Sequence, residues 1–295
     1  MKKDHNKTFL QWATIRKHQP IKLLNAKCFK HFNELTSQLN GKLVYFEYID
    51  LQGNEKYLSF SEGNPIFQCF KVVPQKFYMA DFNDLDYWKS YKQIDSNIFQ
   101  TLLNMDPRKY KISQTSTPLL PEEYILFPLQ TASRQISLIT DICQWAKDNK
   151  RHVVFKDHPV PTYNSVFSDI SDKIPTSSYI THIKHDVNLY DLISHSKEIW
   201  TESSGVGFLA TLLNKKVKYF RNTQDVAYAP IAKLCGNVEE AASDYHLSFE
   251  DVRQYMSWYY HKFAIDVYNE THQKRLKDLY INYFENDYTI EDLYA

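Results

Sequence analysis

Two short stretches of the chain combine the residue types that bind phosphate. The first, residues 201–207, reads Thr-Glu-Ser-Ser-Gly-Val-Gly and holds two of the six glycines in the 295-residue sequence. Apolar runs on either side predict a strand before it and a helix after it. A strand that turns through Ser203, Ser204, Gly205 and Gly207 into a helix presents hydroxyl and N–H groups at the positive helix end, where phosphate binds. The alternative is an ordinary strand-to-helix connection with N-capping serines.

The second stretch, residues 155–159, reads Phe-Lys-Asp-His-Pro and follows an apolar pair. The proline holds His158 in an extended conformation. His158 can therefore donate a hydrogen bond to a phosphate or a leaving group, and Lys156 adds positive charge. The alternative for His158 is a turn histidine at a strand end. Beside the serine turn, Glu202 either binds a ribose hydroxyl or faces water.

The elements that must position these stretches alternate regularly. Short apolar strands are expected at 124–127, 152–155, 179–182, 198–200 and 217–220, and helices at 135–149, 166–174, 189–194 and 208–213. This alternation predicts an α/β domain with a parallel, doubly wound sheet. Ligands of such sheets bind beyond the carboxyl ends of the strands. Both stretches directly follow strands, so we expect them at the same edge.

The N-terminal part is less regular. Strands are expected at 42–48, 57–60 and 77–80 and a helix at 96–105, before a proline-containing segment at 106–121 that marks the best domain boundary. We predict an N-terminal α/β domain at 1–118 and a second, doubly wound α/β domain at 119–245. Residues 246–295, rich in Tyr and Trp, are expected to form helices that cross back to the N-terminal domain.

The composition limits which partners and which location are expected for the protein. Lys plus Arg equals Asp plus Glu at 35 each, which argues weakly against nucleic acid as the main partner. No run of eighteen apolar residues and no apolar signal core occur, so a cytoplasmic protein is expected. The first forty residues are the most basic part, which is compatible with peripheral contact with the inner face of a membrane. The sequence leaves the oligomeric state open.

Metal binding is not expected. The four cysteines are far apart, which disfavours a disulfide framework and a zinc site. His182 and His185 are close together, but no carboxylate or cysteine spacing completes a known site. We interpret both as surface histidines and Asp157 as a loop residue. No metal and no cofactor are predicted.

Further motifs accompany the two phosphate-type stretches. Residues 127–130 read Phe-Pro-Leu-Gln, Ala210 follows the serine turn, residues 215–217 read Lys-Lys-Val, and residues 58–64 read Leu-Ser-Phe-Ser-Glu-Gly-Asn. Together the region 124–230 resembles the bacterial capsule-polysaccharide synthesis family, which includes Kdo transferases that use a CMP-activated sugar. Bacterial sialyltransferases share the His-Pro and Ser-Ser elements in the same order. The resemblance implies a GT-B fold, with two Rossmann-like halves and the donor bound mainly to the second.

The resemblance also implies roles for single residues. It makes His158, Ser203 and Ser204 contacts of the donor phosphate, and His158 a catalytic residue. Including the neighbours of these motifs, the expected donor-binding set is Gln130, Arg134, Lys156, His158, Glu202, Ser203, Ser204, Gly205 and Gly207. Two positions depart from the family: the loop after Gln130 lacks the usual carboxylate and carries Arg134, and Leu209 replaces a frequent glutamate. Because of the missing carboxylate, Glu62 becomes the best candidate for the second catalytic residue; the alternative for Glu62 is a solvated turn carboxylate.

The sequence thus predicts a metal-independent glycosyltransferase with a nucleotide-sugar donor and a glycan or glycolipid acceptor. Three alternatives stay open. One is a phage-type transferase that glycosylates a modified DNA base from a UDP-sugar. Another is a catalytically degenerate protein that binds a nucleotide or glycan, and the third is a related polyol-phosphate polymerase.

Overall fold

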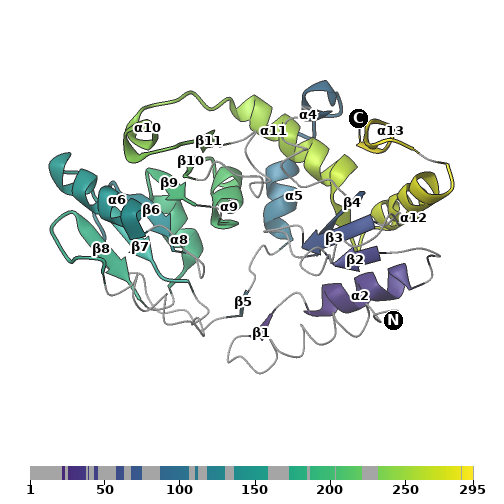
Figure 1. Cartoon of the computed structure of the whole chain (residues 1–295), viewed down its shortest axis with the longest axis horizontal. Helices are drawn as coiled ribbons and strands as arrows, with labels where there is room; N and C mark the ends of the chain where they lie inside the picture. Colours follow the sequence, from purple (N-terminus) through teal and green to yellow (C-terminus); the bar gives the residue numbers. More distant parts are fainter. Residues whose placement is uncertain are drawn as a thin grey trace. The chain divides into compact units, whose positions relative to one another are not determined.

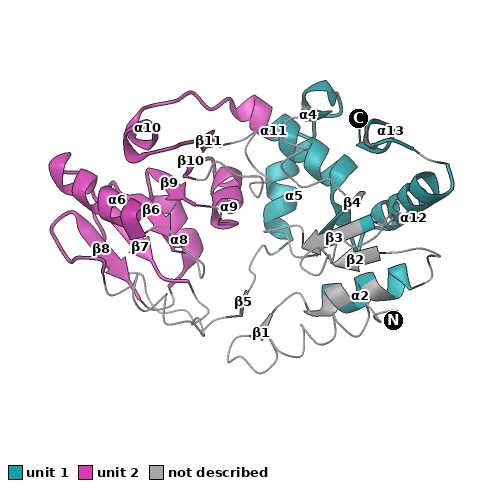
Figure 2. Ribbon diagram, in the orientation of Figure 1, with its two compact units in different colours: residues 1–111, 253–295 teal, residues 112–252 magenta. Residues whose placement is uncertain are grey.

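The computed structural model describes most of the chain in two compact units (Figure 1). The described residues are 22–23, 26–37, 39, 43–45, 58–62, 68–74, 87–105, 110–111, 118–129, 136–158, 173–184, 187–202, 204–220, 232–286 and 288–294. One unit comprises Met1–Lys111 with Arg253–Ala295, and the other comprises Ile112–Val252 (Figure 2). None of the described helices is long and apolar enough to cross a lipid bilayer.

The second unit is built on a six-stranded parallel sheet. Its strands are β6 (Ile125–Pro128), β7 (Val153–Lys156), β8 (Ile180–Ile183), β9 (Glu198–Thr201), β10 (Lys216–Tyr219) and β11 (Lys233–Leu234). They lie in the order β11-β10-β9-β6-β7-β8. The chain therefore builds outward from β6 in one direction, then returns to the other side of β6 with β9. This confirms the predicted doubly wound sheet and places its topological switch between β6 and β9.

Helices cover both faces of this sheet. On one face, α6 (Ile136–Asp148) and α10 (Val238–Ala242) enclose a core that includes Phe127, Phe155 and Trp200. On the other face, α9 (Val206–Leu212) packs on β9 and β10, and the carbonyl of Leu192 in α8 (Leu189–His195) accepts a hydrogen bond from Tyr124. Strands β6 and β7 are buried along their whole length, which explains why they are almost continuous apolar runs in the sequence.

The first unit contains a mixed sheet. Its strands β2 (Leu43–Tyr45), β3 (Leu58–Glu62), β4 (Cys69–Pro74) and β12 (Ile265–Asp266) lie in the order β12-β4-β3-β2. Only the β2–β3 pair is parallel among these described strands; β3–β4 and β4–β12 are antiparallel. Two Rossmann-like halves imply a parallel sheet in each half, and the mixed sheet of the first unit departs from that detail of the expectation. The chain between β3 and β4 is too short for the crossover that parallel strands need, so they form an antiparallel pair.

Further elements complete the first unit. A two-stranded antiparallel sheet joins β1 (Lys22–Leu23) to β5 (Tyr110–Lys111). The described helices of the N-terminal part are α2 (Ala26–Thr36), α4 (Tyr87–Ser90) and α5 (Ile98–Asn104). The predicted helix at 96–105 is thereby confirmed. The strand expected at 77–80, and most of the helix expected at 166–174, lie outside the described residues.

The C-terminal segment packs on the N-terminal part of the chain. It contains α11 (Phe249–Trp258), a π-helix η3 (Tyr259–Phe263), β12, α12 (Glu270–Phe284) and α13 (Ile290–Tyr294). Strand β12 pairs with β4, and the hydroxyl of Tyr294 donates to the carbonyl of Val72. The half-buried guanidinium of Arg275 donates to the carbonyls of His261 and Ala264, which lie at the end of the π-helix. With two α/β units, the fold agrees with the GT-B-like class that the resemblance implies.

Candidate functional site

The strands of the second unit end level with one another at their carboxyl edge. Pro128 pairs in register with Lys156, Lys156 with Ile183, and Tyr219 with Thr201. Leu126 pairs with Ile199, so Pro128 and Thr201 are also level. The two phosphate-type stretches leave this edge directly, one from β7 and one from β9. They flank β6, so both lie at the topological switch.

The first stretch is fixed to its neighbours through the backbone. The N–H of Leu129 donates to the carbonyl of Lys156 at 2.8 Å, and the N–H of Asp157 donates to the carbonyl of Ile183 at 3.0 Å. Lys156 is buried, and its ammonium donates to the carbonyl of Asp157 at 2.6 Å. His158 follows this tied segment and is half-buried. The hydrogen bonds of β7 thus continue one residue past Lys156 and fix the backbone position from which His158 follows.

A buried histidine–carboxylate pair lies beside this segment. The Nε2 of His182 is 2.6 Å from an Oδ of Asp157, and the two side chains are 6% and 12% exposed. Because a carboxylate only accepts hydrogen bonds, Nε2 is the donor. The interpretation of His182 as a surface histidine is therefore wrong. Its position inside the apolar strand β8 was the signal in the sequence, but nothing there pointed to Asp157, 25 residues earlier.

The serine turn uses several of its own polar groups. The N–H of Ser204 donates to Oγ1 of Thr201 at 3.3 Å, and Oγ of Ser204 accepts from the N–H of Val206 at 3.3 Å. The N–H of Gly207 donates to the carbonyl of Ser204 at 3.0 Å. Ser204 thus orders the turn that leads into α9 and is itself half-buried, while the N-cap of the helix is Gly205, which makes no side-chain capping bond.

The other predicted residues of this edge differ in their surroundings. Gly207 is buried and packs against Tyr219, so its smallness serves the contact between α9 and β10. Glu202 is 6% exposed and engaged with other residues, so the alternative in which it faces water is wrong. Gly205 is the N-cap of α9. Gln130, Arg134 and Ser203 lie outside the described residues, and these three calls stay predictions.

The predicted carboxylate, Glu62, belongs to the first unit. It is the last residue of β3 and pairs in register with Phe70 of β4. The alternative places Glu62 in a turn, whereas the structure places it at the end of a strand. Its catalytic role stays a prediction.

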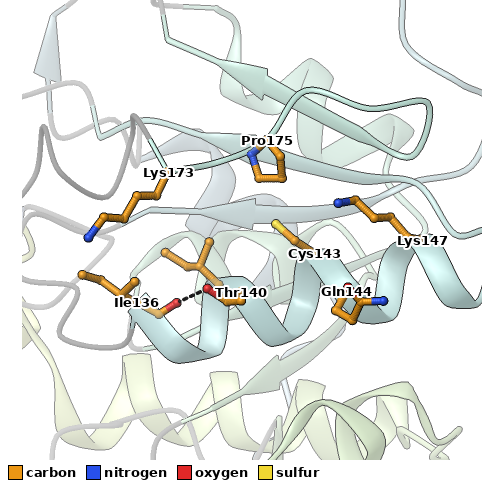
Figure 3. A pocket seen from close by; sticks show the side chains of 8 residues that line it. Ile136, Thr140, Cys143, Gln144, Lys147, Lys173 and Pro175 are labelled. Atoms are coloured by element: carbon orange, nitrogen blue, oxygen red, sulfur yellow. Dashed lines mark hydrogen bonds between the residues drawn. The ribbon is translucent and has the colours of Figure 1, made fainter.

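Two pockets formed by described residues lie away from the carboxyl ends of β6 and β9. One of about 130 Å³ runs along α6, and Figure 3 shows Cys143 and Lys147 of that helix opposite Lys173 and Pro175. The other, of about 370 Å³, lies at the amino ends of the strands. Its cations include Arg151 and Lys197, which pair with Glu123. Among the described residues no group of three His, Cys, Asp or Glu is arranged to hold a metal ion.

Comparisons with known proteins give matches among solved structures. No protein-family model matches the sequence, and no curated protein does. The β-Kdo 2,7 transferase of Thermosulfurimonas dismutans KpsC is 16% identical with a TM-score of 0.44, over 80% of this chain and 88% of that chain. The β-Kdo 2,4 transferase of the same KpsC is 16% identical with a TM-score of 0.44, over 68% and 71%. The UDP-GlcNAc 2-epimerase of Methanocaldococcus jannaschii, in complex with UDP-GlcNAc and UDP, is 15% identical with a TM-score of 0.35, over 68% and 52%.

The matches thus include Kdo transferases, the enzyme class whose motifs the sequence resembles. At these identities and TM-scores, the roles of individual residues have to be derived from this chain itself.

Proposed function

We propose that the protein is a glycosyltransferase that moves a sugar from a nucleotide-activated donor to a glycan or glycolipid acceptor. One observation carries the proposal. The stretch that carries Lys156 and His158 and the serine turn after β9 leave the same edge of a doubly wound sheet, on the two sides of β6. This edge, beside the switch point, is where such sheets bind nucleotides.

The donor phosphate would lie between His158 and the serine turn. When the bond between the sugar and the phosphate breaks, negative charge builds up on the leaving phosphate oxygen. His158 would stabilise this charge by donating a hydrogen bond, and the buried ammonium of Lys156 adds positive charge where screening by water is weak. Ser203, Ser204 and the N–H of Gly205 would contact the phosphate from the other side of β6.

The remaining roles complete the proposal. Glu62 would remove the proton of the acceptor hydroxyl, which is general-base catalysis. Glu202 would bind the ribose, and Gln130 and Arg134 would contact the donor from the loop after β6. These groups together can supply the charge stabilisation that in other transferases comes from a metal, so we propose metal-independent transfer. A CMP-Kdo-like donor is favoured by the motifs, and an acceptor at the inner face of the membrane by the basic N-terminal residues.

The decisive experiment measures transfer and donor hydrolysis with a panel of CMP-sugars and UDP-sugars. The His158→Ala variant should lose about 10²-fold to 10³-fold in turnover, the usual loss when one group that stabilises developing charge is removed. His195→Ala is the control, because this exposed histidine at the end of α8 bonds only to the carbonyl of Asp191 among the described contacts. Equal turnover by wild type and the His158 variant would exclude the proposed site.

A second candidate is a protein that binds the nucleotide without turning it over. The sequence at 131–135, Thr-Ala-Ser-Arg-Gln, favours it, because the carboxylate usual in the family is absent there. Calorimetric titration with CMP and UDP separates the two. Nucleotide binding that depends on His158, with no turnover of any donor, supports the binding protein.

A further inference from the structure

Asp157, which pairs with His182, lies in the sequence between two residues of the proposed donor site. Asp157 directly follows Lys156 and directly precedes His158. Its carboxylate is 2.6 Å from Nε2 of His182, and both side chains are largely buried. Burying a charged carboxylate costs free energy unless it is well paired, so this contact holds the Asp157 side chain firmly.

Strand geometry connects this contact to the orientation of His158. Successive side chains of an extended segment point to opposite faces of a sheet. Phe155 pairs in register with His182, which places Asp157, two residues after Phe155, on the face that His182 occupies. Lys156 lies between Phe155 and Asp157 and therefore points to the opposite face. It is level with Pro128, and so with Thr201, which share that face. Holding Asp157 on one face thus directs Lys156 and His158 to the face of the serine turn.

We propose that Asp157 and His182 are positioning residues that hold Lys156 and His158 toward the donor phosphate. This inference rests on the proposed function. It assigns a role to two residues that the sequence pattern left as a loop carboxylate and a surface histidine. The two residues act through Lys156 and His158 and need no contact with the donor.

Matched substitutions separate positioning from packing. His182→Gln keeps an N–H donor near the place of Nε2, whereas His182→Leu keeps only the volume. Asp157→Asn keeps an acceptor oxygen, whereas Asp157→Ala removes it. Thr181→Val is the control, because Thr181 bonds to Nε2 of His152 at 2.8 Å and so joins the same two strands away from the site.

The experiment measures the dissociation constants of CMP and UDP, kcat and KM with the donor that wild type uses, and unfolding in urea. We expect His182→Leu and Asp157→Ala to lower kcat by up to about 100-fold, the effect of misplacing a reacting group by about 1 Å. His182→Gln and Asp157→Asn should keep most of the wild-type kcat. Thr181→Val should reduce stability without changing kcat or nucleotide binding.

A double-mutant cycle on nucleotide binding tests whether the pair acts through His158. In a His158→Ala background, Asp157→Ala should weaken binding much less than it does in the wild type, and the remaining effect should come from Lys156. Full additivity, or equal damage by His182→Gln and His182→Leu, would overturn the positioning role while leaving the proposed function intact. Absence of both nucleotide binding and turnover in the wild type would instead reject the proposed function, and the inference with it.

Discussion

A Cβ atom added to Gly207 would overlap the phenol oxygen of Tyr219 and lie 2.8 Å from its Cζ atom. It would also lie 3.0 Å from Cγ1 of Val217. Helix α9 therefore packs directly against β10 at Gly207, and a larger residue there would force the Tyr219 side chain to move.

Gly207→Ala should consequently destabilise the protein. Overpacking of a filled core costs about 1–3 kcal/mol, and urea unfolding would measure the loss. Gly236→Ala is the control, because a Cβ there meets nothing nearer than 3.6 Å, a carboxylate oxygen of Glu240. Equal unfolding midpoints for the two alanine variants would contradict the packing role of Gly207.

Ser204→Ala should weaken both the fold and nucleotide binding. Losing the hydrogen bond from the N–H of Val206 should reduce the free energy of unfolding by about 1 kcal/mol. Ser196→Ala serves as the control, because the buried hydroxyl of Ser196 donates to the carbonyl of Ile193 at 2.7 Å, away from the carboxyl edge. Calorimetry with CMP and UDP should show weaker binding for Ser204→Ala and unchanged binding for Ser196→Ala. Unchanged affinity would remove Ser204 from the donor site.

Lys218→Met should be strongly destabilising. The ammonium of Lys218 lies 2.8 Å from Glu198, and the side chains are 2% and 14% exposed. Breaking a buried ion pair from one side leaves the other charge unpaired and costs about 3–5 kcal/mol. Urea unfolding should show that Lys218→Met combined with Glu198→Gln recovers part of the stability that Lys218→Met alone loses.

The exposed pair of Lys197 with Glu123 provides the comparison for Lys218. Glu123→Gln should change the free energy of unfolding by less than about 1 kcal/mol, because water and salt screen this pair. A comparable loss of stability in Lys218→Met and Glu123→Gln would contradict the conclusion that the buried ion pair of Lys218 stabilises the fold.

His272 should make the stability of the protein depend on pH. Burial lowers the pKa of His272 from 6.5 to about 3, with help from the nearby positive charge of Arg275 and from His261. Below pH 6.5 the unfolded chain therefore takes up a proton at His272 that the folded protein does not. Stability should fall as the pH decreases from 6.5 toward 3, with a slope of up to about 1.4 kcal/mol per pH unit.

His272→Asn tests this dependence. Its side-chain oxygen can replace Nδ1 of His272, which accepts from the N–H of Asp266 at 3.0 Å, but it does not titrate in this range. Urea midpoints measured from pH 7 to pH 4 should decrease less steeply for the variant than for wild type. Parallel curves would show that another group controls the acid sensitivity.

The second unit could be predicted well because its strands β6 and β7 are fully buried and therefore apolar. The expected strand at 124–127 became β6, and the one at 152–155 became β7, each within one residue. Strands β4 and β12 were not predicted. Lys71 and Pro74 interrupt the apolar pattern of β4, and a proline in a run argues against a strand. Strand β12 has two residues and therefore no periodicity.

The site could be predicted only in part. His158 and the serine turn follow strands directly, so local sequence was sufficient to place them at one edge. The contact between Asp157 and His182 depends on the register of β7 with β8, which no local pattern determines. For Lys218 the sequence shows an ordinary basic residue, and only the fold brings Glu198 beside it.

Strand β12 gives the first unit a strand that the chain supplies only after the whole second unit. During synthesis, residues 112–252 are therefore complete on the ribosome while the sheet of the first unit still has an open edge at β4. An open edge can pair with other strands, so the nascent protein has to protect β4 until β12 and Tyr294 emerge. The unit that begins first is thus the last to be finished.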